Sequence, residues 1–119
     1  MTEAEDVLRR LWARIDAQDW DGMGALLDPG LHAAYVHTGE TFDADGLVRF
    51  NRDYPGSWRT AVEDLVTTGD RAVSRTRVYD DRQTFYVASF ATVRAGRIVD
   101  LVEVWTGPVG PPPDYRQAL

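Results

Sequence analysis

The 119-residue chain lacks cysteine and lysine, so its 13 basic residues are all arginine. The absence of cysteine excludes disulfides, thiolate metal sites and cysteine nucleophiles. The absence of lysine excludes Schiff-base catalysis and the lysine of a phosphate-binding loop. The two histidines, His32 and His37, have one nearby acid, which is too poor a set for a metal site. Since no cofactor motif is visible either, we expect neither a metal nor a cofactor.

Positive charge and long apolar runs are also scarce. The formal net charge is −6 and the arginines are scattered, which argues against nucleic-acid binding because that binding depends on basic clusters. No window approaches the roughly 20 apolar residues of a membrane span. The acidic residues 1–6 lack the apolar core of a signal peptide. These absences predict a soluble cytoplasmic protein that contacts neither nucleic acid nor membranes.

The first half of the chain has apolar residues at helical spacing. Thr2, Asp19 and Asp43 each precede such a stretch and predict the N-caps of three helices. Residues 31–38 and 41–42 predict a short pair of strands between the second and third helices. One domain of this length can bury a core without disulfides.

From Trp58 onward the apolar pattern alternates with period two, which is typical of strands. Gly69-Asp70 and Ala95-Gly96 lie between such runs and predict tight hairpins. Helices first and an antiparallel meander afterwards predict an α+β domain over residues 1–110, followed by a proline-rich tail at 111–119. The expected strands cover residues 59–68, 71–79, 84–94 and 97–106.

The hairpin turns predict which residues lie opposite each other. A two-residue turn at Ala95-Gly96 places Glu103 opposite Ala88, and the other turns place Arg75 opposite both Asp64 and Ala88. The predicted row Asp64–Arg75–Ala88–Glu103 then crosses four strands on one face. A single β-bulge would shift this register by one residue and move every later side chain to the other face. The same turns predict the pairs Arg94–Arg97, Phe90–Leu101, Tyr86–Trp105 and Val62–Arg77.

Three residues of this row are candidate catalytic groups. Glu103 lies in a strand that otherwise reads as buried, where an ionised carboxylate costs several kcal/mol unless it is paired or protonated. It is either a general acid/base with a raised pKa or a structural partner of Arg75 or Arg77. Asp64 is a second acid, a group that orients Arg75, or a solvated edge charge. Arg75 is a candidate donor to an anionic or carbonyl oxygen.

Aromatic residues are numerous, and those with polar tips are of the kind that line ligand pockets. His37, beside the expected turn at Gly39-Glu40, is a candidate base at a pocket mouth. The opposite sheet face is too apolar for open water and predicts a homodimer through Val87, Ala91, Val102 and Val104. The candidate ligand-binding residues are Tyr35, His37, Tyr54, Trp58, Tyr86, Phe90 and Trp105.

Three segments carry a resemblance to a known family: residues 54–58 (YPGSW), 69–73 (GDRAV) and 96–105 (GRI leading to EVW). With this order of elements, the chain resembles the nuclear-transport-factor-2-like superfamily, and within it the SnoaL-like polyketide cyclase branch. The resemblance implies a cone-shaped α+β roll, a curved antiparallel sheet wrapped around three N-terminal helices. It also implies an apolar pocket and, commonly, a dimer.

The resemblance extends to the candidate acid. In the cyclase-like members an acid on the last strand often serves as general acid/base, and Glu103 matches that position. Those cyclases pair it with a histidine on the preceding strand, whereas residues 84–94 contain none. The Asp–Arg–Asp arrangement of the epoxide-hydrolase relatives is loosely similar to Asp64, Arg75 and Glu103.

Three functions remain open from the sequence. In the first, the chain is a cofactor-independent enzyme acting on an apolar, oxygenated small molecule by cyclisation, isomerisation, dehydration or epoxide opening. Glu103 would move a proton while Arg75 and Asp64 stabilise an oxyanion. In the second, the same pocket binds a ligand without chemistry. In the third, the domain is a protein-interaction scaffold.

Overall fold

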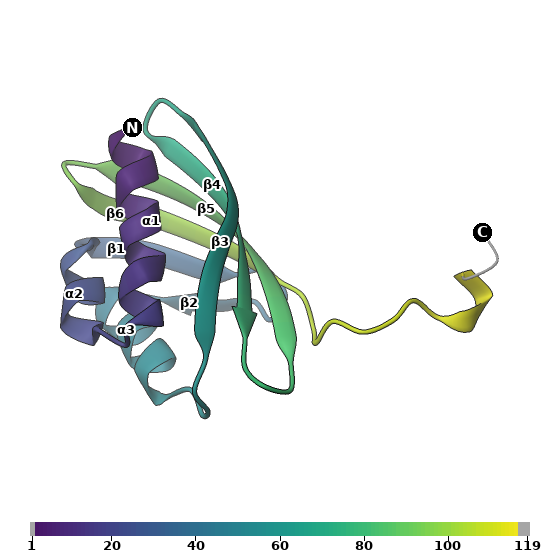
Figure 1. Ribbon diagram of the computed structural model, residues 1–119. Helices are drawn as coiled ribbons and strands as arrows, with labels where there is room; N and C mark the ends of the chain where they lie inside the picture. The colour runs from purple at the N-terminus through teal and green to yellow at the C-terminus, as the bar shows by residue number, and fades with distance from the viewer. Residues whose placement is uncertain (1, 117–119) are drawn as a thin grey trace.

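The computed structural model describes residues 2–116, so Met1 and residues 117–119 of the expected tail lie outside the described part. Two helices, two strands and a third helix come first, and a run of four strands follows (Figure 1). The elements are α1 (Glu3–Asp16), α2 (Trp20–Ala25), β1 (Leu27–Tyr35), β2 (Glu40–Phe42), α3 (Ala44–Asp53), β3 (Arg59–Thr68), β4 (Arg71–Tyr79), β5 (Thr84–Arg94), β6 (Arg97–Trp105) and the short 3-10 helix η1 (Asp114–Arg116).

Each helix begins at the cap that the sequence predicts. The side chain of Thr2 accepts a hydrogen bond from a backbone N–H at 3.1 Å, that of Asp19 at 2.9 Å and that of Asp43 at 2.7 Å. Each bond satisfies one of the backbone donors that a helix start leaves unpaired. The three helix starts are therefore encoded locally.

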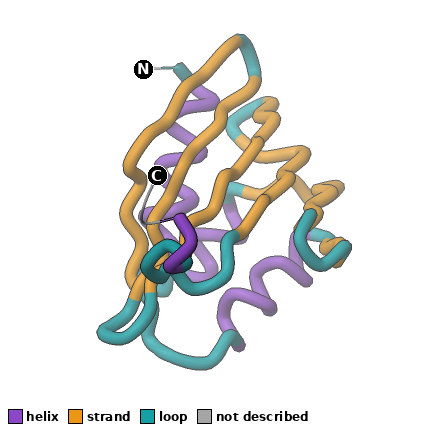
Figure 2. The backbone as a smooth tube through the Cα atoms, turned by 90° about the vertical axis from the view of Figure 1, so that its right-hand side faces the viewer, coloured by secondary structure: helices purple, strands orange, loops and turns teal. Residues whose placement is uncertain are grey.

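The strands form one curved, open, six-stranded sheet in the order β2-β1-β6-β5-β4-β3. The helices cover one face, here called the inner face, and leave the other, the outer face, uncovered by any helix (Figures 1 and 2). This confirms the expected cone-shaped α+β fold. The sheet is mixed rather than antiparallel, because β1 runs parallel to β6. No hairpin joins those two strands, so no turn signal could reveal their pairing.

The expected strands 59–68, 71–79 and 84–94 match β3, β4 and β5. The first strand begins four residues earlier than the expected residue 31. It starts at Leu27, although Pro29 cannot donate to a regular ladder of hydrogen bonds. The pairing with β6 is irregular between Leu27 and His32, and this irregularity accommodates the proline. It ends at Tyr35, which leaves His37 in the following turn rather than on a strand.

A β-bulge in β6 overturns the expected register. Arg94 lies opposite Arg97, as predicted, and Ala95 and Gly96 both have positive φ, at 51° and 77°. Two residues later the ladder slips, since Val93 pairs with Ile98 but Thr92 pairs with Asp100, which leaves Val99 as the extra residue. Beyond this point the observed pairs are Ala91–Leu101, Phe90–Val102, Ser89–Glu103, Ala88–Val104 and Val87–Trp105.

The bulge changes which side chains share a face. Asp64 does lie opposite Arg75, and Arg75 opposite Ala88, but Ala88 pairs with Val104 instead of Glu103. The expected four-residue row is therefore wrong at its last member. The predicted pairs Phe90–Leu101 and Tyr86–Trp105 are wrong for the same reason. Two of the four residues expected at a dimer interface, Val87 and Ala91, lie instead on the inner face and are 1% and 0% exposed, whereas Val102 and Val104 lie on the outer face.

A second irregularity lies in β3 between Val62 and Asp64, where Glu63 is the extra residue. As a result Val62 lies opposite Thr76, and the predicted Val62–Arg77 pair is wrong.

The core fills the space between the helices and the inner face. Leu8 and Leu11 of α1 are at most 1% exposed, as are Ile98 and Leu101 of β6. Full burial of such side chains stabilises a fold by about 1.5–3 kcal/mol each. Within residues 2–116, no helix has the length and hydropathy required to cross a membrane.

Candidate functional site

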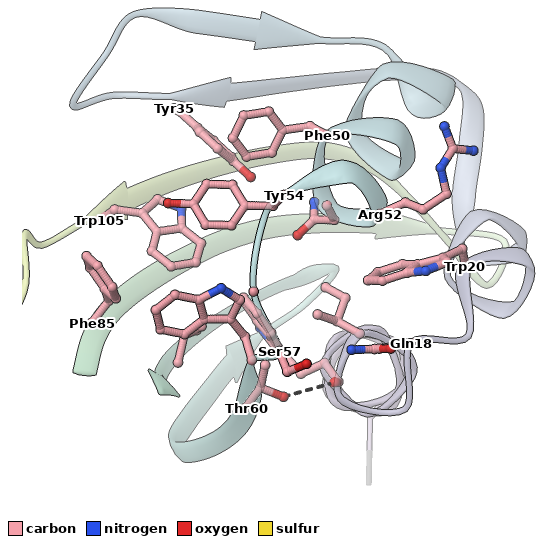
Figure 3. A pocket seen from close by; sticks show the side chains of 16 residues that line it. Gln18, Trp20, Tyr35, Phe50, Arg52, Tyr54, Ser57, Thr60, Phe85 and Trp105 are labelled. Carbon is pink, nitrogen blue, oxygen red and sulfur yellow. Dashed lines mark hydrogen bonds between the residues drawn. The ribbon is translucent and has the colours of Figure 1, made fainter. Parts of the chain in front are cut away.

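A cavity of about 310 Å³ opens between the helices and the inner face of the sheet (Figure 3). All three helices and five of the strands contribute to its wall, as does the loop before β3. This volume lies at the small end of the range for ligand sites. The lining residues are Trp12, Ile15, Gln18, Trp20, Tyr35, Phe50, Asn51, Arg52, Tyr54, Gly56, Ser57, Trp58, Thr60, Val78, Phe85 and Trp105.

Aromatic rings make a continuous chain of contacts around this cavity. Ring centroids lie 5.4 Å apart for Tyr35 and Phe50, and 6.1 Å apart for Tyr35 and Trp105. Such tilted and edge-to-face contacts each stabilise the packing of the rings by about 0.5–1.5 kcal/mol. The whole chain runs Trp12–Trp105–Tyr35–Phe50–Tyr54–Trp58–Phe85.

Polar groups in the cavity wall are few and mostly neutral. Arg52 is the one charged residue among those that line the cavity. Its guanidinium donates to the Asp53 carboxylate at 2.9 Å and 3.2 Å. Figure 3 shows this guanidinium pointing away from Tyr54 and Trp105. The cavity therefore favours uncharged ligands, because a charged ligand would lose its hydration without gaining an ion-pair partner.

Glu103 lies on the inner face, as expected, and is 4% exposed. Ser89 Oγ donates to its Oε2 at 2.6 Å, and Trp105 Nε1 is 3.3 Å from its Oε1. No arginine or histidine in the described chain lies within ion-pair distance of this carboxyl. Burial raises the pKa of Glu103 from 4.5 to about 7, and the hydrogen bonds from Ser89 and Trp105 limit the rise. The ion-pair interpretation of Glu103 is thus wrong in this structure.

The bulge places Glu103 in a polar row across the inner face. Ser74 of β4 lies opposite Ser89 of β5, Ser89 opposite Glu103 of β6, and Glu103 beside Tyr35 of β1. Ser74 is 1% exposed, and its Oγ has no hydrogen-bond partner in the described structure. The neighbours of the carboxyl are therefore neutral polar groups rather than groups of opposite charge.

Tyr35 links this row to the cavity. It lines the cavity and is 4% exposed. Burial raises the pKa of its phenol, the nearby Glu103 raises it further, and a hydrogen bond with the Asn51 side chain lowers it. The phenol therefore stays protonated at any ordinary pH and can take part as a hydrogen-bond donor or acceptor.

The other two candidate catalytic residues lie away from the cavity. Asp64 and Arg75 oppose each other on the outer face, so the sheet separates them from Glu103. Arg75 Nε is 4.0 Å from Glu63 Oε1, and Arg77 Nε is 3.8 Å from Glu63 Oε2. The structure does not bring the expected acid–arginine–acid group together, because the bulge in β6 leaves Glu103 on the inner face while Asp64 and Arg75 lie on the outer face.

The candidate ligand-binding residues divide in the same way. Four of them line the cavity: Tyr35, Tyr54, Trp58 and Trp105. Tyr86 and Phe90 lie on the outer face, because the register shift places them opposite Thr106 and Val102. His37 is exposed in the turn after β1, where its ring stacks on Tyr35 at 5.8 Å.

Sequence reasoning missed most of the helical part of the wall. Trp12, Trp20 and Phe50 lie on apolar helix faces, which fits a core residue equally well. Asn51 shares such a face with Leu47, and a lone amide on an apolar face was an available signal. The expected register gives the cavity side of β5 to Tyr86, whereas the structure gives it to Phe85. Among residues 2–116, no cluster of three acidic or histidine side chains could hold a metal ion.

Comparison with known proteins places this geometry in a family. A solved structure from Kribbella flavida, named as a candidate ketosteroid isomerase, is 21% identical and superimposes with a TM-score of 0.86 over 98% of this chain and 87% of that chain. An NTF2-like protein of unknown function from Burkholderia xenovorans is 19% identical, with a TM-score of 0.82 over 98% of this chain and 91% of its own.

A further solved structure is IdmH, a candidate polyketide cyclase from Streptomyces antibioticus. It is 18% identical, with a TM-score of 0.75 over 87% of this chain and 92% of its own. Among curated protein sequences, none is significantly similar to the chain. The model of the SnoaL-like domain matches residues 8–101. The chain therefore belongs to the SnoaL-like domain family of the NTF2-like superfamily.

Proposed function

We propose that the chain is a small-molecule enzyme that binds an uncharged, oxygenated ligand in the aromatic cavity and uses Glu103 to move a proton. The observation that carries this proposal is the Glu103 carboxyl, which is 4% exposed and has hydrogen-bond donors but no ion-pair partner among residues 2–116. With a pKa of about 7, both of its protonation states are populated near neutral pH, as a general acid/base requires.

The cavity wall supports a flat, mainly apolar ligand. Aromatic rings offer apolar surface and fixed geometry. The wall offers few neutral polar groups to a ligand oxygen, among them Tyr35 and the Asn51 side chain that hydrogen-bonds with it. Thr60 Oγ1 already donates to Trp12 O at 3.2 Å, so it can only accept from a ligand hydroxyl. Two of the matched structures carry the names of an isomerase and a cyclase, and reactions of both kinds proceed by proton transfer.

The proton transfer requires the Trp105 side chain to move. Its indole lines the cavity and donates to Glu103, whereas Glu103 itself is not among the lining residues. A ligand can reach the carboxyl only if this indole moves aside. The protonated carboxyl would then donate to a ligand oxygen, and the carboxylate would accept a proton from carbon. Asp64 and Arg75 lie on the outer face and have no part in this step.

The same shielding of Glu103 favours a second candidate function. If Trp105 stays in place, the cavity can hold a ligand but the carboxyl never touches it. The chain would then be a binding module in which Glu103 has a structural role.

A ligand screen with a matched variant separates the two functions. The probes are uncharged polycyclic ketones, aromatic polyketides and terpenoid epoxides, with binding measured by thermal shift and turnover by mass spectrometry. We expect Glu103→Gln to keep the thermal shift of any probe that the wild-type chain converts, and to lose turnover by at least about 100-fold, the usual contribution of a general acid/base. Glu63→Gln, which changes an outer-face carboxylate, should retain both.

The outcomes are distinct. Full turnover in Glu103→Gln would remove the acid/base assignment. Binding without turnover across the panel, with Glu103 still titrating as in the free protein, would establish the binding module instead.

We also propose that two copies of the chain pair through their outer faces. Val66 and Val104 on this face are 60% and 42% exposed, and such apolar surface favours an interface. Arg71, Thr92 and Asp100 lie in one row across β4, β5 and β6. A two-fold axis along β5 would therefore place Arg71 of one chain over Asp100 of its partner, which matches opposite charges.

Light scattering tests this pairing. We expect a dimeric mass at micromolar concentration, and a monomeric mass for Val104→Asp, because an unpaired carboxylate in the interface is costly. Val36→Asp changes a valine that is 59% exposed in the turn after β1 and should leave the mass unchanged. A wild-type monomer would overturn the proposal.

A further inference from the structure

The chain does not end at the sheet. Residues 107–116, here called the arm, leave the end of β6 and are exposed along their whole length. Figure 1 shows the arm projecting away from the body, and in Figure 2 it comes toward the viewer from the face of the sheet that the helices do not cover. The molecule measures 50 × 32 × 26 Å as a result. The arm thus extends on the side where a second chain would pack.

The arm is anchored at its base. Thr106 N donates to Tyr86 O at 2.9 Å, and Val109 N donates to Thr84 O at 2.8 Å, so its first residues continue along β5. Four of its residues are proline, which favours the extended polyproline II conformation and leaves little conformational entropy to lose on docking. These hydrogen bonds set the direction of the arm as far as Val109.

The arm also carries apolar groups outward. Val109 is 54% exposed, and Tyr115 is 72% exposed near the far end in η1. The Arg116 guanidinium lies 5.5 Å from the centre of the Tyr115 ring. Extended proline-rich segments of this kind bind apolar and aromatic surfaces of other proteins. Tyrosine is also among the residues that dominate interface energies.

We propose that the arm docks on a second copy of this chain, so that each chain of a dimer is held by the arm of its partner. The inference rests on the dimer proposed above, because a copy packed on the outer face lies where the arm already points. A match over 98% of the chain must include most of the residues after Trp105, so the Kribbella and Burkholderia structures each have a segment that corresponds to much of the arm. A segment at this position is therefore present in other members of the fold.

The competing occupant is the chain's own cavity. The base of the arm adjoins Trp105 and Phe85, which line the cavity, so a reversal of the arm at Gly107 or Gly110 could bring Tyr115 over its mouth. The observed direction of the arm opposes this arrangement. The test must therefore distinguish an arm that covers its own cavity from an arm that docks on a partner.

The absence of cysteine makes the test direct, since one introduced thiol can be labelled alone. Full-length Tyr115→Cys is coupled to a benzophenone maleimide. It is then mixed with wild-type chains that carry ¹⁵N but no benzophenone. The mixture is unfolded and refolded so that some dimers contain one chain of each kind. After irradiation, mass spectrometry of the cross-linked peptides shows which chain the arm touched. Asp81→Cys, exposed in the turn between β4 and β5, is the matched control for random capture.

We expect cross-links from position 115 to ¹⁵N peptides, well above those from position 81. We also expect the unlabelled variant Tyr115→Ala to raise the dissociation constant of the dimer about tenfold, a typical effect of a buried interface tyrosine. Cross-links confined to the labelled chain, or no more than the control gives, would overturn the arm while leaving the dimer intact. A monomeric wild-type chain would overturn both.

Discussion

Replacing Glu103 by glutamine should make the protein more stable at alkaline pH and leave it unchanged at acidic pH. The carboxyl is 4% exposed, and its pKa rises from 4.5 to about 7 because burial disfavours the charged form. Between these two pH values the folded chain holds a proton that the unfolded chain has released. Stability therefore falls as the pH rises through this window.

The size of the effect follows from the same shift. One pKa unit corresponds to about 1.36 kcal/mol, so a rise from 4.5 to about 7 makes the ionised carboxylate destabilising by about 3 kcal/mol above pH 7. Glutamine has the same shape and no charge to desolvate. Its amide can accept from Trp105 and donate to Ser89 Oγ, so both neighbours keep a partner.

Urea unfolding followed by far-UV circular dichroism measures the difference. We expect the free energies of unfolding of Glu103→Gln and wild type to agree within about 0.5 kcal/mol at pH 4.5, and the variant to be about 3 kcal/mol more stable at pH 8. All samples must have one protein concentration, because dimer formation would shift the apparent stability. Other titrating groups are present in both proteins and cancel in the comparison.

Glu63→Gln is the matched control. This carboxylate is on the outer face beside Arg75 and Arg77, and exposed ion pairs contribute about 0–1 kcal/mol. A constant difference between wild type and Glu103→Gln from pH 4.5 to pH 8 would refute the assignment of a buried, unpaired carboxyl. A variant less stable than wild type at pH 8 would mean that the charge of Glu103 is compensated.

Two further measurements address single contacts. Ser89→Ala removes the donor 2.6 Å from Glu103 and should raise the pKa of Glu103 further, measured by carboxyl-carbon NMR; an unchanged or lower pKa would contradict the role of this hydroxyl. Asp16→Ala removes the carboxylate at the end of α1 that accepts from Arg59 at 3.0 Å and from Thr60 N at 2.8 Å, and should destabilise the fold by about 1–2 kcal/mol at pH 7 in urea unfolding. The Arg59 hydrogen bond lowers the pKa of Asp16, so this difference should shrink as the pH falls below 3.8, and a difference that stays constant would show that the charge is not involved.

Local signals explain why so much of the fold was predictable. The caps at Thr2, Asp19 and Asp43 act within three residues, and the turns at Gly69-Asp70 and Ala95-Gly96 act within two. The alternation of apolar residues gave β3, β4 and β5 their bounds for the same reason. Interactions confined to neighbouring residues leave a readable pattern in the sequence.

Long-range pairing left no such pattern. Val99 is the extra residue of the bulge, and neither its residue type nor its neighbours in the sequence distinguish it from other strand valines. Side chains alternate between the two faces of a strand, so one extra residue changes which side chains of β5 share a face with Glu103. It brought Ser89 to the carboxyl and left Asp64 and Arg75 on the far side of the sheet.

Local sequence patterns are enough to predict the helix caps, the tight turns, the bounds of β3, β4 and β5, and the burial of Glu103 in an apolar strand. What surrounds that carboxyl depends on contacts between strands, some of them distant in the chain. Its environment of Ser89, Trp105 and Tyr35 comes from β5, β6 and β1, and the parallel pairing of β1 with β6 joins residues far apart in the chain. The pKa of a buried group depends on the atoms packed around it, so it follows from the register of the whole sheet rather than from the neighbours of Glu103 in the sequence.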